Sequence, residues 1–139
     1  MTNEEKDLLF KDLCARLPYY VRVNYKGEVY DVLGIINGRL VLCKPFQSHG
    51  LEYNPLVEEV KPYLFPMSSM TEEQRREYTK AQSDDGDIVF SCAIKYVETG
   101  ADIVSAEYHA TDWLNAHHFD YRGLIEKGLA IDATELNVY

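Results

Sequence analysis

The sequence predicts a single α+β domain: an N-terminal helix, a small curled antiparallel sheet, and a C-terminal helical half packed on that sheet. Apolar residues recur every three or four positions over 2–17 and about every second position over 19–44, the periods of a helix and of strands. Dipeptides typical of tight turns separate the strand segments. The length of 139 residues is that of one domain, so we expect residues 1–139 to share one core.

The helix is predicted over 2–17. Thr2 and Glu5 have capping-box spacing, in which each side chain bonds the backbone N–H of the other residue. Pro18 is expected to end the helix, because proline cannot continue it. Its apolar stripe is expected to comprise Leu9, Phe10, Leu13, Cys14 and Leu17.

An antiparallel meander is predicted to follow. Its elements are three strands over 20–25, 28–36 and 39–43, joined by the turns Lys26-Gly27 and Asn37-Gly38. Alternation in the second strand places Tyr30, Val32 and Ile36 on one face. After a loop over 45–55, a fourth strand over 56–61 is expected to complete the sheet. Short strands with tight turns favour a small barrel of SH3-like type and, equally, a plain curved sheet.

The second half, 66–139, is predicted to be rich in helix. We expect an extended connector over 62–66, a helix over 72–82 that begins at a second capping box of Thr71 and Gln74, a turn over 83–87, a strand over 88–97 and a helix over 101–117. An alternative starts a new helix at Thr111 and leaves 101–109 as a strand.

The C-terminal end is predicted to turn sharply. Asp120 is expected to cap a short helix over 121–127, which Gly128 ends in the left-handed conformation. A short edge strand over 130–133 and a loosely held tail over 134–139 follow.

The net charge of −9 is unevenly distributed. Residues 1–65 hold 8 Lys/Arg and 9 Asp/Glu, a net charge of −1, whereas residues 66–139 hold 6 and 14, a net charge of −8. An acidic chain opposes nonspecific binding to nucleic acid or to an anionic membrane, which requires a basic surface. The acidic half either keeps the protein in solution or presents an acidic surface to a basic partner.

The sequence also predicts a compartment. No apolar run approaches the ~20 residues needed to span a bilayer, and the acidic stretch MTNEEKDLLF lacks the layout of a signal peptide. We therefore expect a cytoplasmic protein with no membrane contact. The three cysteines lie far apart, so we expect buried thiols rather than disulfides or metal ligands.

The stretch 111–128 holds the only Trp and the pair His117-His118. We interpret it as a structural lock made of Trp113, Leu114, His117, Phe119, Asp120 and Gly128. Adjacent histidines on a helix point about 100° apart and do not chelate one metal in the usual manner. No nucleophile motif or phosphate-binding loop accompanies them, so we predict no catalytic residue, no metal and no cofactor.

Eleven tyrosines are many for this length, and tyrosine is enriched at recognition surfaces. Together with the acidic second half, they predict an interaction surface that includes Tyr20, Tyr25, Tyr30, Glu72, Glu73, Asp84 and Asp85. Arg22 and Arg39 lie near the tyrosines and leave open a nucleic-acid-binding module. A second alternative is an enzyme that uses His117 or His118 for proton transfer.

Three stretches carry a resemblance to a known group. They are LCARLPYYVRV at 13–23, VEEVKPYLFPMSSMTEEQ at 57–74 and DWLNAHHFDYRGLIEKGLAID at 112–132. They resemble a family of small uncharacterised proteins of gut Bacteroidales, whose members are similar to cargo of prophages and other mobile elements. Residues 24–56 and 83–110 depart from the family pattern. The resemblance implies an origin and no activity, so we expect a non-catalytic accessory protein whose partner is another protein.

Overall fold

The structure is a computed structural model, and it describes residues 1–45, 53–81 and 108–139. Contacts divide the chain into two compact units: Met1–Met67 with His118–Tyr139, and Ser68–His117. The predicted turn over 83–87, the strand over 88–97 and the beginning of the helix over 101–117 lie outside the described residues. So do Asp84, Asp85 and Cys92.

The N-terminal helix, α1 (Asn3–Arg16), confirms the first prediction. The Thr2 hydroxyl accepts a hydrogen bond from Glu5 N at 3.1 Å, and the Glu5 carboxylate accepts one from Thr2 N at 3.1 Å. The short 3₁₀ turn η1 (Leu17–Tyr19) follows at Pro18.

The buried stripe of α1 differs from the predicted one. Its members are Leu9, Asp12, Leu13 and Arg16. Phe10 is 40% exposed. Cys14 is exposed and Cys43 is half-buried, so the prediction of buried thiols is wrong for Cys14 and is met only in part at Cys43. The charged residues Asp12 and Arg16 are buried in place of the predicted Phe10 and Cys14. Their side chains bond each other, as described below.

The meander is present, with the predicted bounds for its second and third strands, whereas the first strand, predicted over 20–25, begins only at Arg22. It comprises β1 (Arg22–Tyr25), β2 (Glu28–Ile36) and β3 (Arg39–Cys43), paired antiparallel in that order. Asn37 and Gly38 have φ values of 52° and 74°, as a type I′ turn requires.

A β-bulge changes the faces of β2. The register between β2 and β3 shifts between Val32 and Gly34, which leaves Leu33 without a partner across the ladder and 58% exposed. A bulge inserts one residue, so every side chain beyond it moves to the other face. Ile35 therefore packs against the core and Ile36 is 64% exposed, which contradicts the predicted alternation.

The fourth strand lies later in the chain than predicted. Residues Val57–Glu59 form the 3₁₀ turn η2, and β4 runs from Val60 to Pro66, through the segment predicted to be a connector. The β4 strand pairs antiparallel with β1, and among the described residues the far side of β3 is paired only at two isolated bridges, Arg39↔Leu56 and Leu42↔Tyr53. The sheet is therefore open, and the SH3-like barrel is not formed.

The sheet is mixed rather than purely antiparallel. Two short strands, β5 (Phe119–Asp120) and β6 (Ile131–Asp132), pair with β4 in the parallel direction. The predicted edge strand over 130–133 is thus confirmed, whereas hydrophobic periodicity did not reveal β5, which is only two residues long. The α+β class is confirmed.

The link from β5 to β6 consists of turns, not the predicted helix over 121–127. The Asp120 carboxylate still caps it, accepting hydrogen bonds from Leu124 N and Ile125 N, each at 2.9 Å. Gly128 has φ 72°, the left-handed conformation expected there. Gly123 also has positive φ, 74°, which interrupts the helical path near its start.

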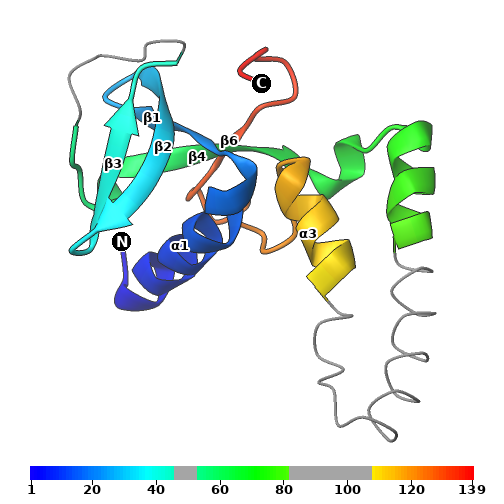
Figure 1. Ribbon diagram of the computed structural model, residues 1–139, viewed down its shortest axis with the longest axis horizontal. Coiled ribbons are helices and arrows are strands. Elements are labelled where there is room, and N and C mark those ends of the chain that lie inside the picture. The colour runs from blue at the N-terminus through cyan, green and yellow to red at the C-terminus, as the bar shows by residue number, and fades with distance from the viewer. Residues whose placement is uncertain (46–52, 82–107) are drawn as a thin grey trace, which may run out of the picture. The chain divides into compact units, whose positions relative to one another are not determined.

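One core joins α1, the sheet and the turns after β5. It is lined by the buried residues Leu9, Leu13, Val21, Val23, Val32, Leu40, Leu42, Val60, Leu64, Leu124 and Leu129. The apolar stripe of α1 supplies two of these, so the helix covers one face of the meander (Figure 1).

The second unit contains two described helices. The first, over 72–81, begins at the predicted capping box: Gln74 N donates to the Thr71 hydroxyl at 3.1 Å, and Thr71 N donates to the Gln74 side chain at 2.9 Å. The second is α3 (Tyr108–Ala116). In the parts of the chain that are described, no helix is both long and apolar enough to cross a bilayer.

Candidate functional site

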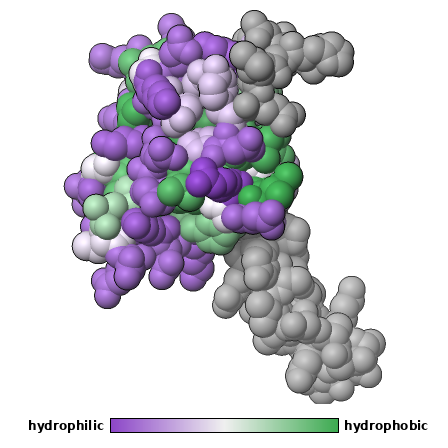
Figure 2. Space-filling view, turned by 90° about the vertical axis from the view of Figure 1, so that its left-hand side faces the viewer, coloured by the Kyte–Doolittle hydropathy of each residue, from purple (hydrophilic) through white to green (hydrophobic). Residues whose placement is uncertain are grey.

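The predicted tyrosine surface is only partly a surface. Tyr25 is 9% exposed and Tyr30 is 4% exposed. Their rings pack with Tyr53 at centroid distances of 5.4–6.0 Å, and the Tyr30 hydroxyl donates to Glu28 at 3.0 Å. Tyr25 and Tyr30 therefore close one end of the core. Figure 2, which shows the β2–β3 side of the molecule, has mostly hydrophilic residues with hydrophobic ones in small separate groups.

Tyr20 differs from the other predicted tyrosines, because it is 40% exposed and its backbone is unusual. Its φ and ψ are 80° and 130°, a conformation that a bulky side chain rarely adopts. His118 also has positive φ, 64°. Residues held in such regions are strained and cluster at functional sites, so the place where these two rings meet is a candidate site.

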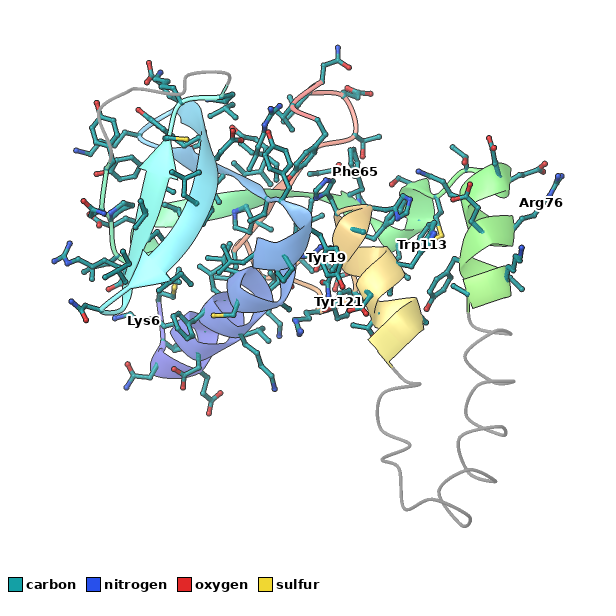
Figure 3. All side chains as sticks on the ribbon, in the orientation of Figure 1. Lys6, Tyr19, Phe65, Arg76, Trp113 and Tyr121 are labelled. Carbon is teal, nitrogen blue, oxygen red and sulfur yellow. The ribbon has the colours of Figure 1, made fainter. Side chains whose placement is uncertain are left out.

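The two rings meet around Tyr139. The His118 imidazole stacks on the Tyr139 ring at 3.7 Å and 10°, and Tyr20 approaches edge-on at 6.3 Å. Phe65, labelled in Figure 3, lies 6.0 Å from the same ring. We call the rings of Tyr20, Phe65 and His118, with the main-chain groups of Arg22 and Tyr63 described next, the aromatic box.

Main-chain groups bind the hydroxyl of Tyr139. It accepts a hydrogen bond from Arg22 N at 2.9 Å and donates one to Tyr63 O at 2.9 Å. Although 38% of the Tyr139 surface is exposed, burial of the hydroxyl raises the pKa of Tyr139, against a lowering effect of the contact with Arg22. The phenol therefore stays protonated over the physiological range.

Arg22 ties the box to the residue before Tyr139. Its guanidinium donates from Nε to Asp31 at 3.0 Å and from Nη1 to the Val138 carbonyl, and it lies 5.1 Å from the centroid of the Tyr20 ring. Burial, and then the Asp31 carboxylate, raise the pKa of Tyr20. The predicted loose tail over 134–139 is therefore wrong at its last two residues, which are held by these bonds.

A second polar cluster, buried in the first unit, was not predicted. Arg16 donates to Asp12 from Nε at 2.8 Å and from Nη2 at 3.1 Å, and also to the Phe119 carbonyl at 2.7 Å. Arg122 donates to Asp12 at 3.3 Å. Asp12 and Arg16 are fully buried. This cluster anchors β5 to α1 and so has a structural role; its sequence signal is an Asp–Arg pair four residues apart beside Leu9 and Leu13.

The six residues of the predicted lock fall in both units. Trp113, Leu114 and His117 belong to the second unit, and Phe119, Asp120 and Gly128 belong to the first. Leu114, Phe119 and Asp120 are buried. Trp113 is half-buried, with His117 stacked on it at 4.0 Å and the Tyr78 ring at 5.6 Å.

The two histidines of the enzyme alternative both pack on aromatic rings. His117 stacks on Trp113, and its Nδ1 lies 2.8 Å from the Trp113 carbonyl. His118 stacks on Tyr139. Among the described residues, no group of three or more His, Cys, Asp or Glu side chains is placed to hold a metal ion.

The charged residues that were predicted to bind a basic partner or nucleic acid differ in their exposure and in their bonds. Glu72 and Glu73 are exposed, but the same helix also carries the exposed Arg75, Arg76 and Lys80, so its described surface is not purely acidic. The side chain of Arg22, proposed for nucleic acid, is only 12% exposed and bonded to Asp31. Arg39 is exposed and donates to the Asn54 carbonyl at 2.9 Å.

Comparison with protein-family models, with curated proteins and with solved structures found no match to this chain.

Proposed function

We propose that this protein is a non-catalytic interaction protein and that the aromatic box is where it contacts another protein. The observation that supports this is that the box already holds an aromatic side chain, Tyr139, at the protein surface. Buried aromatic anchors carry much of the binding energy at protein interfaces. An aromatic residue of a partner would find the same contacts there.

The strained backbone at Tyr20 and His118 supports the same proposal. Holding a non-glycine residue in a sparsely populated conformation costs about 1–3 kcal/mol, and such strain persists where the surrounding structure enforces it. Here it sets two rings in place before a ligand arrives. Pre-organised side chains lose less entropy on binding, which strengthens an interaction without adding contacts.

The proposed partner is a protein of a mobile element or of its host. The resemblance of the stretches at 13–23, 57–74 and 112–132 to a mobile-element family supports this origin, and the box residues Tyr20, Phe65 and His118 all lie in those stretches. The acidic charge of the chain favours a partner protein over nucleic acid.

The experiment is a selection of displayed random peptides on the immobilised Tyr139→Ala variant, in which the occupant ring is absent. We expect enriched peptides to share an aromatic residue and to lose at least about tenfold in affinity when Tyr20→Ala is added. The matched control is Tyr53→Ala, an exposed tyrosine at the other end of the meander, which should leave binding unchanged. Failure to enrich any peptide, or binders that are insensitive to Tyr20→Ala, would contradict the proposal.

A further inference from the structure

The position of the Tyr139 hydroxyl indicates what kind of side chain the box recognises. Strands β1 and β4 pair through Val23↔Pro62, Asn24↔Lys61 and Tyr25↔Val60. The next pair in this antiparallel register would be Arg22 with Tyr63. There the direct ladder stops, and the hydroxyl of Tyr139 lies between the strands, bonded to Arg22 N and Tyr63 O. The hydroxyl thus replaces one step of the ladder.

A donor and an acceptor fixed by two strands distinguish a phenol from a plain ring. A ring without a hydroxyl leaves the N–H of Arg22 and the C=O of Tyr63 without this bridge. Sites that bind a hydroxyl through fixed hydrogen-bonding groups discriminate against analogues that lack it. The box is therefore suited to tyrosine and not to phenylalanine.

The contact to Val138 adds the main chain to this recognition. The Arg22 guanidinium, held by Asp31, donates to the Val138 carbonyl, so the box binds both the tyrosine ring and the preceding peptide group. By contrast, residues 134–137 are all exposed, and the hydrogen bonds described for Thr134 and Leu136 are local ones to Asp132 and Ala133, so Tyr139 and Val138 connect the end of this segment to β1 and β4. A segment held by so few contacts is open to competition from another that offers the same groups.

We infer that the box is a tyrosine-recognition site for an extended segment of a partner protein, and that Tyr139 occupies it as an internal competitor. This inference rests on the proposed function and adds to it the chemistry of the ligand and the control of access. Partner binding then requires release of Tyr139, so variants that lack the Tyr139 ring bind more tightly than the native chain.

The test uses p-cresol, which carries the tyrosine side-chain group, and toluene, which lacks only the hydroxyl. Each is titrated into the native protein, Tyr139→Ala and Tyr139→Phe, with binding followed by NMR shifts of His118 and Tyr20. We expect p-cresol to bind Tyr139→Ala at least about tenfold more tightly than it binds the native protein, and at least about tenfold more tightly than toluene does. Tyr139→Phe should be intermediate, because its ring still fills the box.

Three outcomes would overturn the inference: no p-cresol binding to folded Tyr139→Ala, equal affinity for p-cresol and toluene, or equal affinity of the native and variant proteins. If Tyr139→Ala does not fold, the native protein still decides, since saturating p-cresol should displace the Tyr139 ring and shift its own resonances, whereas toluene should not. If the selection enriches peptides but p-cresol does not bind, only the tyrosine inference is refuted. If p-cresol binds but the selection enriches no peptide, the proposed function is refuted.

Discussion

The carboxylate of Asp12 is a charged group in the interior of the first unit. It is fully buried and accepts hydrogen bonds from both Arg16 and Arg122. A buried ion pair contributes little net stability compared with apolar residues, but removing one partner leaves a charge without compensation. Asp12 therefore has to stay paired once the helix has docked.

We predict that Asp12→Ala lowers the free energy of unfolding by about 3–5 kcal/mol, because Arg16 would remain buried without its counterion. Urea denaturation measures this. The control is Asp7→Ala, an exposed aspartate on the same helix, which should change stability by no more than about 0.5 kcal/mol. Similar values for the two variants would show that the pair is not buried in solution.

The Tyr139 hydroxyl predicts a pH dependence. Because its pKa is raised in the folded protein, the contribution of the phenol to stability is fully present below the unfolded value of about 10 and is lost as the pH rises towards the folded pKa. Tyr139→Phe should therefore be less stable than the native protein near neutral pH, by about 0.5–1.5 kcal/mol, since the hydroxyl no longer bridges the two main-chain groups.

The difference between the native protein and Tyr139→Phe should be constant up to about pH 9 and should shrink in urea titrations above about pH 10. Tyr20 and Tyr30 also have raised pKa values, but they are present in both proteins and cancel in the difference. A difference that stays constant with pH would mean that the phenol is not bound as described.

Single residues were predictable where the backbone chemistry is local. The caps at Thr2 and Asp120 and the left-handed glycine at 128 follow from side-chain oxygens and from the missing Cβ. Tyr139 was not predictable, because its contacts are to Arg22 and Tyr63, which are distant in sequence. The positive φ of Tyr20 was likewise not predictable, because a tyrosine rarely adopts this conformation.

The hairpin between β2 and β3 allows a matched test of turn chemistry. Gly38 and Gly34 both have open space where a Cβ would lie, but only Gly38 has positive φ, 74°. We predict that Gly38→Ala lowers stability by about 1–2 kcal/mol, the cost of the left-handed conformation, and that Gly34→Ala is close to neutral. Thermal melts of both variants measure this, and equal melting temperatures would contradict the type I′ assignment.

Elements of regular period were predicted well, and interruptions were not. The bounds of β2 and β3 agree with the alternation of apolar residues. The bulge at Leu33, however, reverses the faces beyond it, and periodicity has no means of showing one extra residue. The sequence predicts a connector over 62–66, whereas β4 includes both Pro62 and Pro66 although proline lacks the N–H that a ladder uses.

The whole molecule consists of two units whose residues interleave in sequence. The second unit, Ser68–His117, is an insertion in the sequence of the first: it begins within η3 (Met67–Ser69) and ends before β5. The hydrogen bond from Phe65 N to the His118 carbonyl, 2.8 Å, places the two ends of this insertion side by side. The sequence predicted one domain in two successive halves, because charge and period are read along the chain and do not reveal a return to the first sheet.

We predict that replacing residues 68–117 with a short Gly-Ser linker leaves the first unit folded, because its core and all the sheet pairing described lie within it. The dispersion of amide chemical shifts in an NMR spectrum and a cooperative thermal melt of the shortened chain test this. Adding Asp12→Ala should destabilise the shortened chain as much as the full one. A shortened chain that is disordered would show that the first unit depends on the residues removed.

The parallel pairing of β4 has a consequence for biosynthesis. All residues of β1 to β4 have been synthesised once the ribosome has made residue 66, but the partners of the last residues of β4, which are β5 and β6, are made only after the whole of 68–117. During that interval Tyr63, Leu64 and Phe65 present an unpaired apolar strand edge, the kind that recruits other chains. Slow translation through 68–117 would lengthen this exposure, so codon choice there should affect the yield of native protein more than codon choice before residue 60.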